Sequence, residues 1–179
     1  MSKKVLVIST SLRNHSNSEV LAESFAKGAA EAGNQVEVVS LKEKDIRFCK
    51  GCLACQRTLK CVIADDAPEI VEKMKEAEVI AFASPIYYYE MSGQMKTLLD
   101  RANPLYSADY RFRDIYFLMT AAEGEQEATE RAVSGLEGWI ACFEKARLAG
   151  TVFGGGVDQA GEIEGHRSVA EAYKMGKAV

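Results

Sequence analysis

Four cysteines lie close together in the sequence, with a spacing that could hold a metal–sulfur group. They are Cys49, Cys52, Cys55 and Cys61. Consecutive C-x2-C steps allow one tight loop to surround an iron–sulfur core, as in ferredoxins. A zinc site more often uses two C-x2-C pairs separated by a longer arm. Val62 follows the last cysteine, where ferredoxins normally have proline. The spacing therefore favours a [4Fe-4S] cluster over zinc.

Basic residues between these cysteines leave a second interpretation open. Lys50, Arg57 and Lys60 would favour thiolates, so the cysteines could instead remain as reactive or structural thiols. The fifth cysteine, Cys142, stands apart on a predicted helix, and we expect it to be a small buried side chain that takes no part in the chemistry.

The second candidate site is the polar segment 9–18, which lies between an apolar run and a helical pattern. The first N–H groups of a helix are unsatisfied and its N-terminus is positive, so anions bind there. Ser16 and Glu19 also fit a capping box, but a cap alone does not require so many hydroxyl groups with Arg13 beside them. The side chains that could donate to phosphate oxygens are Ser11, Arg13, Ser16, Asn17 and Ser18.

The type of phosphate ligand follows from the motifs that the chain lacks. Neither G-x-G-x-x-G nor G-x-x-x-x-G-K-[ST] occurs, so a dinucleotide fingerprint and an ATPase loop are both unsupported. A mononucleotide phosphate bound without these motifs suggests flavin mononucleotide (FMN). Two further segments suit its ring: Pro85 precedes three tyrosines whose faces can pack against a heterocycle, and the small residues of 120–124 allow close backbone approach.

Short β-rich runs alternate with helical patterns along the whole chain, and these elements must position the candidate sites. We predict strands over residues 3–9, 35–41, 79–83, 115–120 and 149–153. We predict helices from residue 19 to about 33, over 67–76, 91–102 and 125–145, and from about 167 to 177.

This alternation predicts an α/β fold, a three-layer sandwich with a parallel five-stranded sheet between helices. The common five-strand arrangement is the flavodoxin-like order 2-1-3-4-5, which places ligands beyond the carboxyl ends of the strands. We expect one domain over residues 1–179, with the cysteine loop 48–61 inserted after the second strand. The candidate loops would then meet at one edge of the sheet.

Composition and charge exclude other classes of protein. The net charge of −4 argues against nucleic-acid and anionic-membrane partners. The apolar run 5–8 is too short for a signal-peptide core, and no run approaches a transmembrane length. We therefore expect a cytoplasmic protein, in which a cysteine cluster binds metal or is redox-active more often than it forms disulfides.

Three motifs together resemble the NAD(P)H-dependent FMN reductases, and most closely their iron–sulfur flavoprotein branch. They are Ser-Leu-Arg-x-x-Ser-Asn-Ser at 11–18, Cys-x-Gly-Cys-x-x-Cys-x5-Cys-x-x-x-Asp-Asp at 49–66, and Pro-Ile-Tyr-Tyr-Tyr-x-Met-Ser-x-Gln-Met-Lys-x-x-x-Asp-Arg at 85–101. The resemblance implies a flavodoxin-like fold, bound FMN, NAD(P)H as co-substrate and a homodimer or homotetramer. It also implies which residues meet FMN: Ser9, Ser11, Arg13, Ser16, Asn17 and Ser18 around the phosphate, Pro85, Ile86, Tyr87 and Tyr88 along the ribityl chain and ring, and Thr120, Ala121 and the following residues to Gly124 on the other side.

The expected activity is transfer of electrons from NAD(P)H through FMN to a small acceptor, such as a quinone, flavin, azo or nitro compound. With a cluster present, electrons would instead leave singly to a one-electron carrier. The alternative is an iron–sulfur flavoprotein electron carrier fed by ferredoxin and not by a nicotinamide. A non-enzymatic metal-binding or redox-sensing module is a third class, but it would leave the phosphate and tyrosine loops unexplained. Because the chemistry belongs to the cofactor, no catalytic side chain is expected.

Overall fold

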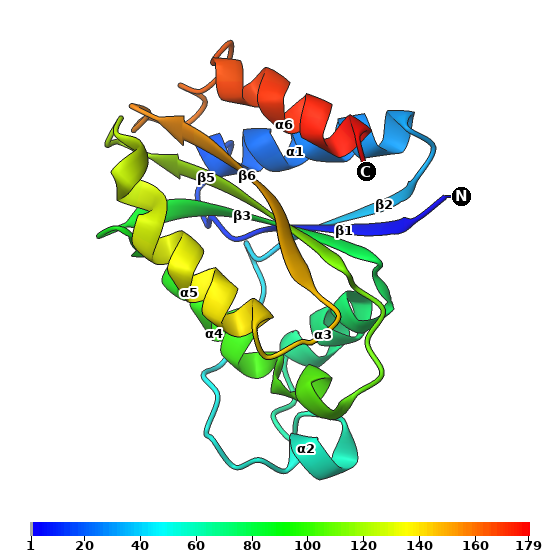
Figure 1. Ribbon diagram of the computed structural model, residues 1–179. Coiled ribbons are helices and arrows are strands. Elements are labelled where there is room, and N and C mark those ends of the chain that lie inside the picture. The colour runs from blue at the N-terminus through cyan, green and yellow to red at the C-terminus, as the bar shows by residue number, and fades with distance from the viewer. Residues whose placement is uncertain (1) are drawn as a thin grey trace.

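A parallel sheet forms the middle layer of the computed structural model, which describes residues 2–179 (Figure 1). Its parallel strands are β1 (Lys4–Ser9), β2 (Gln35–Ser40), β3 (Val79–Tyr87), β5 (Asp114–Ala121) and β6 (Arg147–Gly155). They are arranged in the order β2-β1-β3-β5-β6, which confirms the predicted 2-1-3-4-5 topology. A short strand that was not predicted, β4 (Glu90–Met91), pairs antiparallel with the end of β3.

Helices cover both faces of this sheet (Figure 1). On one face lie α1 (Asn17–Glu31) and α6 (Arg167–Lys177), and on the other lie α3 (Ala67–Glu76), α4 (Gly93–Arg101) and α5 (Glu130–Ile140). Three single-turn elements, α2 (Cys55–Thr58), η1 (Asn103–Ser107) and η2 (Gln126–Thr129), lie in connections. The strand β1 explains this layering, because Val5 and Val7 belong to the core under α1 while Leu6 and Ile8 belong to the opposite core. A strand buried on both faces must be apolar at every position.

The helices α1 and α6 approach one another at backbone distance. A Cβ atom built on Gly176 would lie 2.0 Å from the carbonyl oxygen of Phe25, and one built on Gly28 would lie 2.1 Å from that of Tyr173. Only glycine permits such an approach at these two positions. This contact fixes α1 against α6, and α1 begins at the carboxyl end of β1.

The predicted long helix over residues 125–145 is wrong at both ends. The structure begins this segment with the 3-10 turn η2, starts α5 at Glu130 and ends it at Ile140. Tight turns follow, with the Phe143 N–H donating to the Ile140 carbonyl at 2.8 Å. Phe143 is nevertheless buried in the same core as α5. The apolar pattern of this segment continues to Phe143, so it predicts a helix longer than α5. Burial continues beyond Ile140, whereas the helical hydrogen bonds end there.

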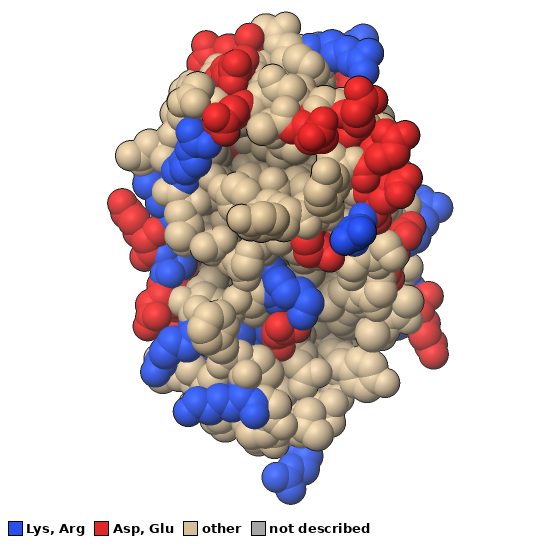
Figure 2. All heavy atoms as spheres, turned by 90° about the vertical axis from the view of Figure 1, so that its left-hand side faces the viewer, with Lys and Arg blue, Asp and Glu red and all other residues tan. Residues whose placement is uncertain are grey.

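The carboxyl ends of the central strands meet at one edge of the sheet, which is seen on the left of Figure 1 and faces the viewer in Figure 2. The loops that follow β1, β3, β5 and β6 all lie there. None of the helices within residues 2–179 is long and apolar enough to cross a membrane.

Candidate functional site

The loop after β1 forms the predicted helix cap, and the side chains predicted to donate to a phosphate lie in the same loop. Glu19 N–H donates to Ser16 Oγ at 3.2 Å, and Ser16 N–H donates to Glu19 Oε2 at 3.4 Å, so the capping box is formed. Asn17 and Ser18 are buried in the first turn of α1. The structural and the phosphate-binding interpretations are compatible, because a capping box leaves other N–H groups of the first turn available to an anion.

Ser9, the last residue of β1, has a buried hydroxyl group without a hydrogen-bond partner within residues 2–179. Strand alternation puts its side chain on the same face as Val5 and Val7, which is the face covered by α1. Leaving a buried donor unsatisfied costs about 1–3 kcal/mol. An anion at the N-terminus of α1 would give this hydroxyl a partner, so the residues fit the phosphate of FMN.

Four loops at the carboxyl edge of the sheet enclose a pocket of about 130 Å³. Its lining residues are Ser11, Arg13, Ser16, Asn17, Ser18, Pro85, Ile86, Tyr87, Thr120, Ala121, Ala122, Val157 and Asp158. Eleven of the fifteen residues that the resemblance implies around FMN therefore line one pocket, and their role as ligands stays a prediction. Ser9, Tyr88, Glu123 and Gly124 do not line the pocket.

The segment after β6 closes this pocket, and the sequence reasoning did not include it. Arg13 Nη1 donates to the Asp158 carbonyl at 2.8 Å, and Asn17 Nδ2 donates to the Gln159 carbonyl at 2.9 Å. His15 Nε2 also lies 2.7 Å from Glu164 Oε1. The guanidinium group expected to pair with phosphate is thus already engaged through one of its donors. The glycines at 154–156, at the carboxyl end of β6, were the signal in the sequence that could have indicated this segment.

A buried network of hydroxyl groups joins the ends of β1 and β3 to the start of α4. Thr10 Oγ1 donates to the Ala83 carbonyl at 2.9 Å and lies 3.0 Å from Ser92 Oγ. Ser92 N–H donates to Ser84 Oγ at 3.0 Å, and Ser92 Oγ caps α4 by accepting from Met95 N–H at 3.3 Å. This network fixes the β3–β4 hairpin beside the pocket.

The four loop cysteines line a second pocket, of about 400 Å³, below the sheet. Cys55 is buried, Cys61 is partly exposed, and Cys49 and Cys52 are exposed. Within residues 2–179, no three His, Cys, Asp or Glu side chains lie close enough together to hold a single metal ion. The sulfur atoms thus line one pocket without converging on one point, and their role as cluster ligands stays a prediction.

Polar donors surround the sulfur atoms of this pocket. Asn103 Nδ2 donates to Cys55 Sγ at 3.1 Å, and Gly51 N–H donates to Cys49 Sγ at 3.4 Å. The expectation that Cys142 is buried and apart is wrong, because its side chain is exposed, follows the end of α5 and lines the same pocket. Cys142 is exposed because α5 ends at Ile140 and does not extend over this residue, as the predicted helix did.

A buried ion pair holds the base of the cysteine loop together. Arg101 Nη1 lies 2.6 Å from Asp65 Oδ2, Arg101 Nη2 lies 2.8 Å from Asp65 Oδ1, and both side chains are 0% exposed. Arg101 also donates to the carbonyls of Arg47 at 2.7 Å and Ile63 at 3.3 Å, and so joins the two ends of the loop. Bidentate pairs of this kind are geometrically specific as well as strong.

The charges of this pair are stabilised in different ways. Burial raises the pKa of Asp65, but the hydrogen bond from Arg101 and the N–H groups of Arg47 and Ala67 outweigh it, so the pKa falls from 3.8 to about 2. The hydrogen bond to Asp65 raises the pKa of Arg101 against the effect of burial, and Cys61 adds to the rise. Arg101 therefore stays charged in its buried position between the two ends of the loop.

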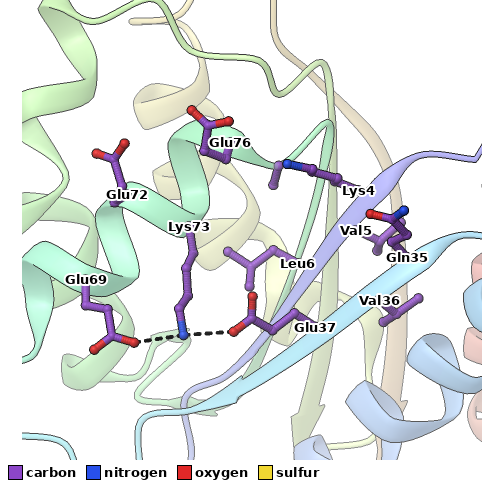
Figure 3. Close-up of a pocket in the computed structure, with 11 residues that line it drawn as sticks. Lys4, Val5, Leu6, Gln35, Val36, Glu37, Glu69, Glu72, Lys73 and Glu76 are labelled. Carbon is purple, nitrogen blue, oxygen red and sulfur yellow. Dashed lines mark ion pairs between the residues drawn. The ribbon is translucent and has the colours of Figure 1, made fainter.

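A third pocket, of about 570 Å³, lies between the edge strand β2 and α3, near the amino ends of the strands (Figure 3). Lys73 bridges Glu37 at 2.8 Å and Glu69 at 2.9 Å across its floor. The hydrogen bonds that the Lys73 ammonium group donates to these two carboxylates raise the pKa of Lys73. The groups are paired and far from the carboxyl edge, so this pocket is separate from the site.

Comparison with known proteins agrees with this geometry. Residues 3–156 match the family described as NADPH-dependent FMN reductase. The chain belongs to this family. The resemblance seen in the sequence motifs is therefore confirmed, and the FMN reductase fold accounts for the site at the carboxyl edge.

Two curated relatives of this FMN reductase family member are named iron–sulfur flavoproteins. One, from Methanocaldococcus jannaschii, is 42% identical over 102 residues, which are 57% of this chain and 53% of the relative. The other, from Methanosarcina thermophila, is 29% identical over 138 residues, 76% of this chain and 72% of the relative. With the first of these relatives, the matched part spans about half of the relative's length.

Solved structures share the fold over nearly the whole chain. The NAD(P)H:quinone oxidoreductase from Methanothermobacter marburgensis has a TM-score of 0.77 at 18% identity, and the match covers 99% of this chain and 96% of that one. An azoreductase from Bacillus anthracis has a TM-score of 0.73 at 18% identity, with both chains fully covered. At 18% identity this likeness shows the fold alone, and it agrees with the flavodoxin-like strand order of this member of the FMN reductase family.

Proposed function

We propose that this chain is an FMN-dependent oxidoreductase that takes electrons from NAD(P)H and passes them to a small acceptor. The acceptor class is a quinone, flavin, azo or nitro compound. The observation that carries the proposal is the buried Ser9 hydroxyl, which has no hydrogen-bond partner within residues 2–179 and lies on the face of the sheet that α1 covers, in a chain of the FMN reductase family. For a quinone the balance is NAD(P)H plus one proton plus quinone giving NAD(P)⁺ plus hydroquinone.

The pocket at the carboxyl edge of the sheet, called the flavin pocket from here on, would hold FMN by its phosphate and ribityl chain. The first-turn N–H groups of α1 and the hydroxyl groups of Ser11 and Ser18, which line this pocket, are donors suited to the phosphate, and the Ser9 hydroxyl behind its lining would be a further one. A pocket of about 130 Å³ is smaller than the usual 300–1,000 Å³ ligand site, so part of the mononucleotide would extend past Tyr87. Bound FMN would supply hydride acceptance and onward electron transfer.

We further propose that Cys49, Cys52, Cys55 and Cys61 hold a [4Fe-4S] cluster. Their common pocket, the N–H groups directed at two of the sulfur atoms and the names of the relatives support this. Electrons could then leave singly, which also supports the second candidate, an electron carrier fed by ferredoxin. Reactive thiols remain the alternative for the cysteines.

The proposed working form is a cytoplasmic homodimer or homotetramer. Large apolar side chains are exposed around the cysteine loop, including Phe48, Leu53 and Val62, with Phe48 81% exposed. A surface of this kind favours contact with another protein chain.

The test is to measure iron, acid-labile sulfide and flavin in one sample of protein purified without oxygen, and then to add NADH or NADPH. We expect one FMN per chain that bleaches on addition of the nicotinamide, with about four irons and four sulfides. Bound FMN that only reduced ferredoxin can bleach would favour the electron carrier. Purified and reconstituted protein without flavin would refute both.

A matched pair of variants tests the cluster separately. Cys55→Ser changes a predicted ligand, whereas Cys142→Ser changes a cysteine of the same pocket that lies outside the motif. We expect iron to fall sharply in Cys55→Ser and to stay at the wild-type level in Cys142→Ser, with FMN retained in both. Equal iron in Cys55→Ser and wild type would contradict the assignment.

A further inference from the structure

The turn between β3 and β4 has a backbone conformation that suits glycine and asparagine, but two tyrosines occupy it. Ile86 pairs with Met91 and Tyr87 with Glu90, so Tyr88 and Tyr89 form a two-residue hairpin loop. Their φ angles are +52° and +67°. Positive φ at both positions is the pattern of a type I′ turn, for which Asn-Gly is strongly preferred. Bulky residues with positive φ are conformational outliers.

Packing does not compensate for this strain at the first tyrosine. The side chain of Tyr88 is 98% exposed, so its ring buries almost nothing within the chain. Tyr89 is 51% exposed and has the Arg131 guanidinium 6.0 Å from its ring centroid. Strain held at an exposed position beside a ligand pocket is typical of functional residues.

We propose that the Tyr88 ring is the surface on which a flat, aromatic electron acceptor stacks at the mouth of the flavin pocket. This inference rests on the proposed oxidoreductase function and specifies its substrate class. Tyr87, the preceding residue, lines the pocket, so the turn stands at its rim. A tyrosine has few rotatable bonds and an extended π face, so it binds planar rings at a low entropic cost.

The hairpin that carries the ring is rigid at its base. Ser92 N–H donates to the buried Ser84 hydroxyl, and Met91 is buried against the sheet. The ring is therefore presented from a fixed backbone, which reduces the ordering cost of binding.

Charges of both signs border the pocket. Acidic side chains gather along one rim of this face (Figure 2), where the loop after β5 and the turn η2 carry exposed Glu123, Glu125 and Glu127, whereas Arg13 lines the pocket and Arg131 lies beside Tyr89. A neutral fused-ring quinone tests ring stacking without a contribution from these charges, so menadione is a suitable probe.

The test compares menadione reduction by FMN-loaded wild type, Tyr88→Asn and Tyr88→Phe. Loss of one aromatic stack corresponds to a rise in menadione KM of about three- to tenfold in Tyr88→Asn. Tyr88→Phe keeps the π face and is expected to keep the KM within twofold of wild type. Tyr88→Asn also suits positive φ, so its Tm is expected to stay the same or to rise by about 2–4 °C.

Glu43→Gly is the matched control. Glu43 is exposed, has φ +66° and lines none of the three pockets described above, so glycine there relieves similar strain without touching the site. Its Tm is expected to rise while the menadione KM stays unchanged. A shift of the same size in the menadione KM of Glu43→Gly would show that relief of turn strain, and not loss of the Tyr88 ring, changes acceptor binding. That result would overturn the proposal.

Three other results would also overturn it. The first is a menadione KM within twofold of wild type in Tyr88→Asn, and the second is an equal rise in Tyr88→Phe. The third is a Tyr88→Asn variant whose FMN affinity falls while the menadione KM of its loaded fraction is unchanged, since the ring would then serve the cofactor. If wild-type FMN is not bleached by NADH or NADPH, the proposed function itself fails and this inference fails with it.

Discussion

The buried pair Arg101–Asp65 provides a sharp test of how the cysteine pocket is built. Arg101→Met keeps most of the side-chain length but removes the guanidinium group, which leaves the Asp65 carboxylate buried. Removing one partner of a buried pair costs about 3–5 kcal/mol, because the remaining charge is left uncompensated. The cost here should lie near the lower limit, since Asp65 keeps the Arg47 and Ala67 N–H groups at 2.9 and 3.1 Å and has Arg47 Nε at 3.6 Å.

A loss of about 3 kcal/mol corresponds to a fall in Tm of about 6–12 °C for a chain of this size. The measurement is urea unfolding of Arg101→Met, Asp65→Asn and the double variant, followed by circular dichroism. The two single losses should not add in the double variant, because each already breaks the same contact. Limited trypsin digestion gives a local readout, since Lys50, Arg57 and Lys60 lie in the loop and should be cleaved faster when its base opens.

The control lies on the same helix. Lys96 and Asp100 form an exposed i,i+4 pair at 2.7 Å, so Lys96→Met should change the unfolding free energy by no more than about 0.5 kcal/mol. The reasoning is refuted if Arg101→Met costs less than about 1 kcal/mol, or if the single losses add fully in the double variant.

Three further predictions follow from single contacts. Because the pKa of Asp65 in the folded protein lies below 3.8, the ionised carboxylate stabilises the fold above that pH. Urea unfolding should show a loss of about 1–2 kcal/mol, after allowance for solvent screening, as the pH falls from 3.8 towards 2. An Asp65→Asn variant with the same acid dependence would contradict this prediction. Gly176→Ala should lower the free energy of unfolding by about 1–3 kcal/mol or more in the same assay. Gly138→Ala in α5, where a Cβ meets nothing within 4 Å, should leave it unchanged or raise it by up to about 1 kcal/mol. Equal effects of the two substitutions would disprove the close contact between α1 and α6. Asn103→Ala removes the N–H donated to Cys55 Sγ, so in loaded protein a redox titration should show a more negative cluster potential, and an unchanged potential would exclude that contact from tuning it.

The layer architecture could be predicted because each central strand is apolar in an unbroken run. Val5–Ile8 and the run at 79–83 have no polar face, so both faces had to be covered, and strand order then followed from the connections. The loop after β1 was predictable for a similar reason, since its donors are adjacent in sequence and helix capping is a local interaction.

The parts that could not be predicted depend on contacts between distant residues. Arg101 follows two polar positions on α4, Lys96 and Asp100, that are both exposed, and nothing local distinguishes it from them. Its burial is set by Asp65, which lies 36 positions away. The closing segment at 157–158 reaches Arg13 across 145 positions. Periodicity carries no information about such pairs, and only the folded chain brings them together.

Helix α4 connects the two candidate sites physically. Its first turn is capped by Ser92, which belongs to the hydroxyl network beside the flavin pocket, and its last residue is Arg101, which closes the cysteine loop. Nine helical residues span about 13 Å. The candidate FMN pocket and the cysteine pocket are therefore joined by one helix with a polar anchor at each end. If the proposed FMN and cluster are bound, this helix would keep them at a fixed separation, because a shift of either end of α4 breaks a buried hydrogen bond.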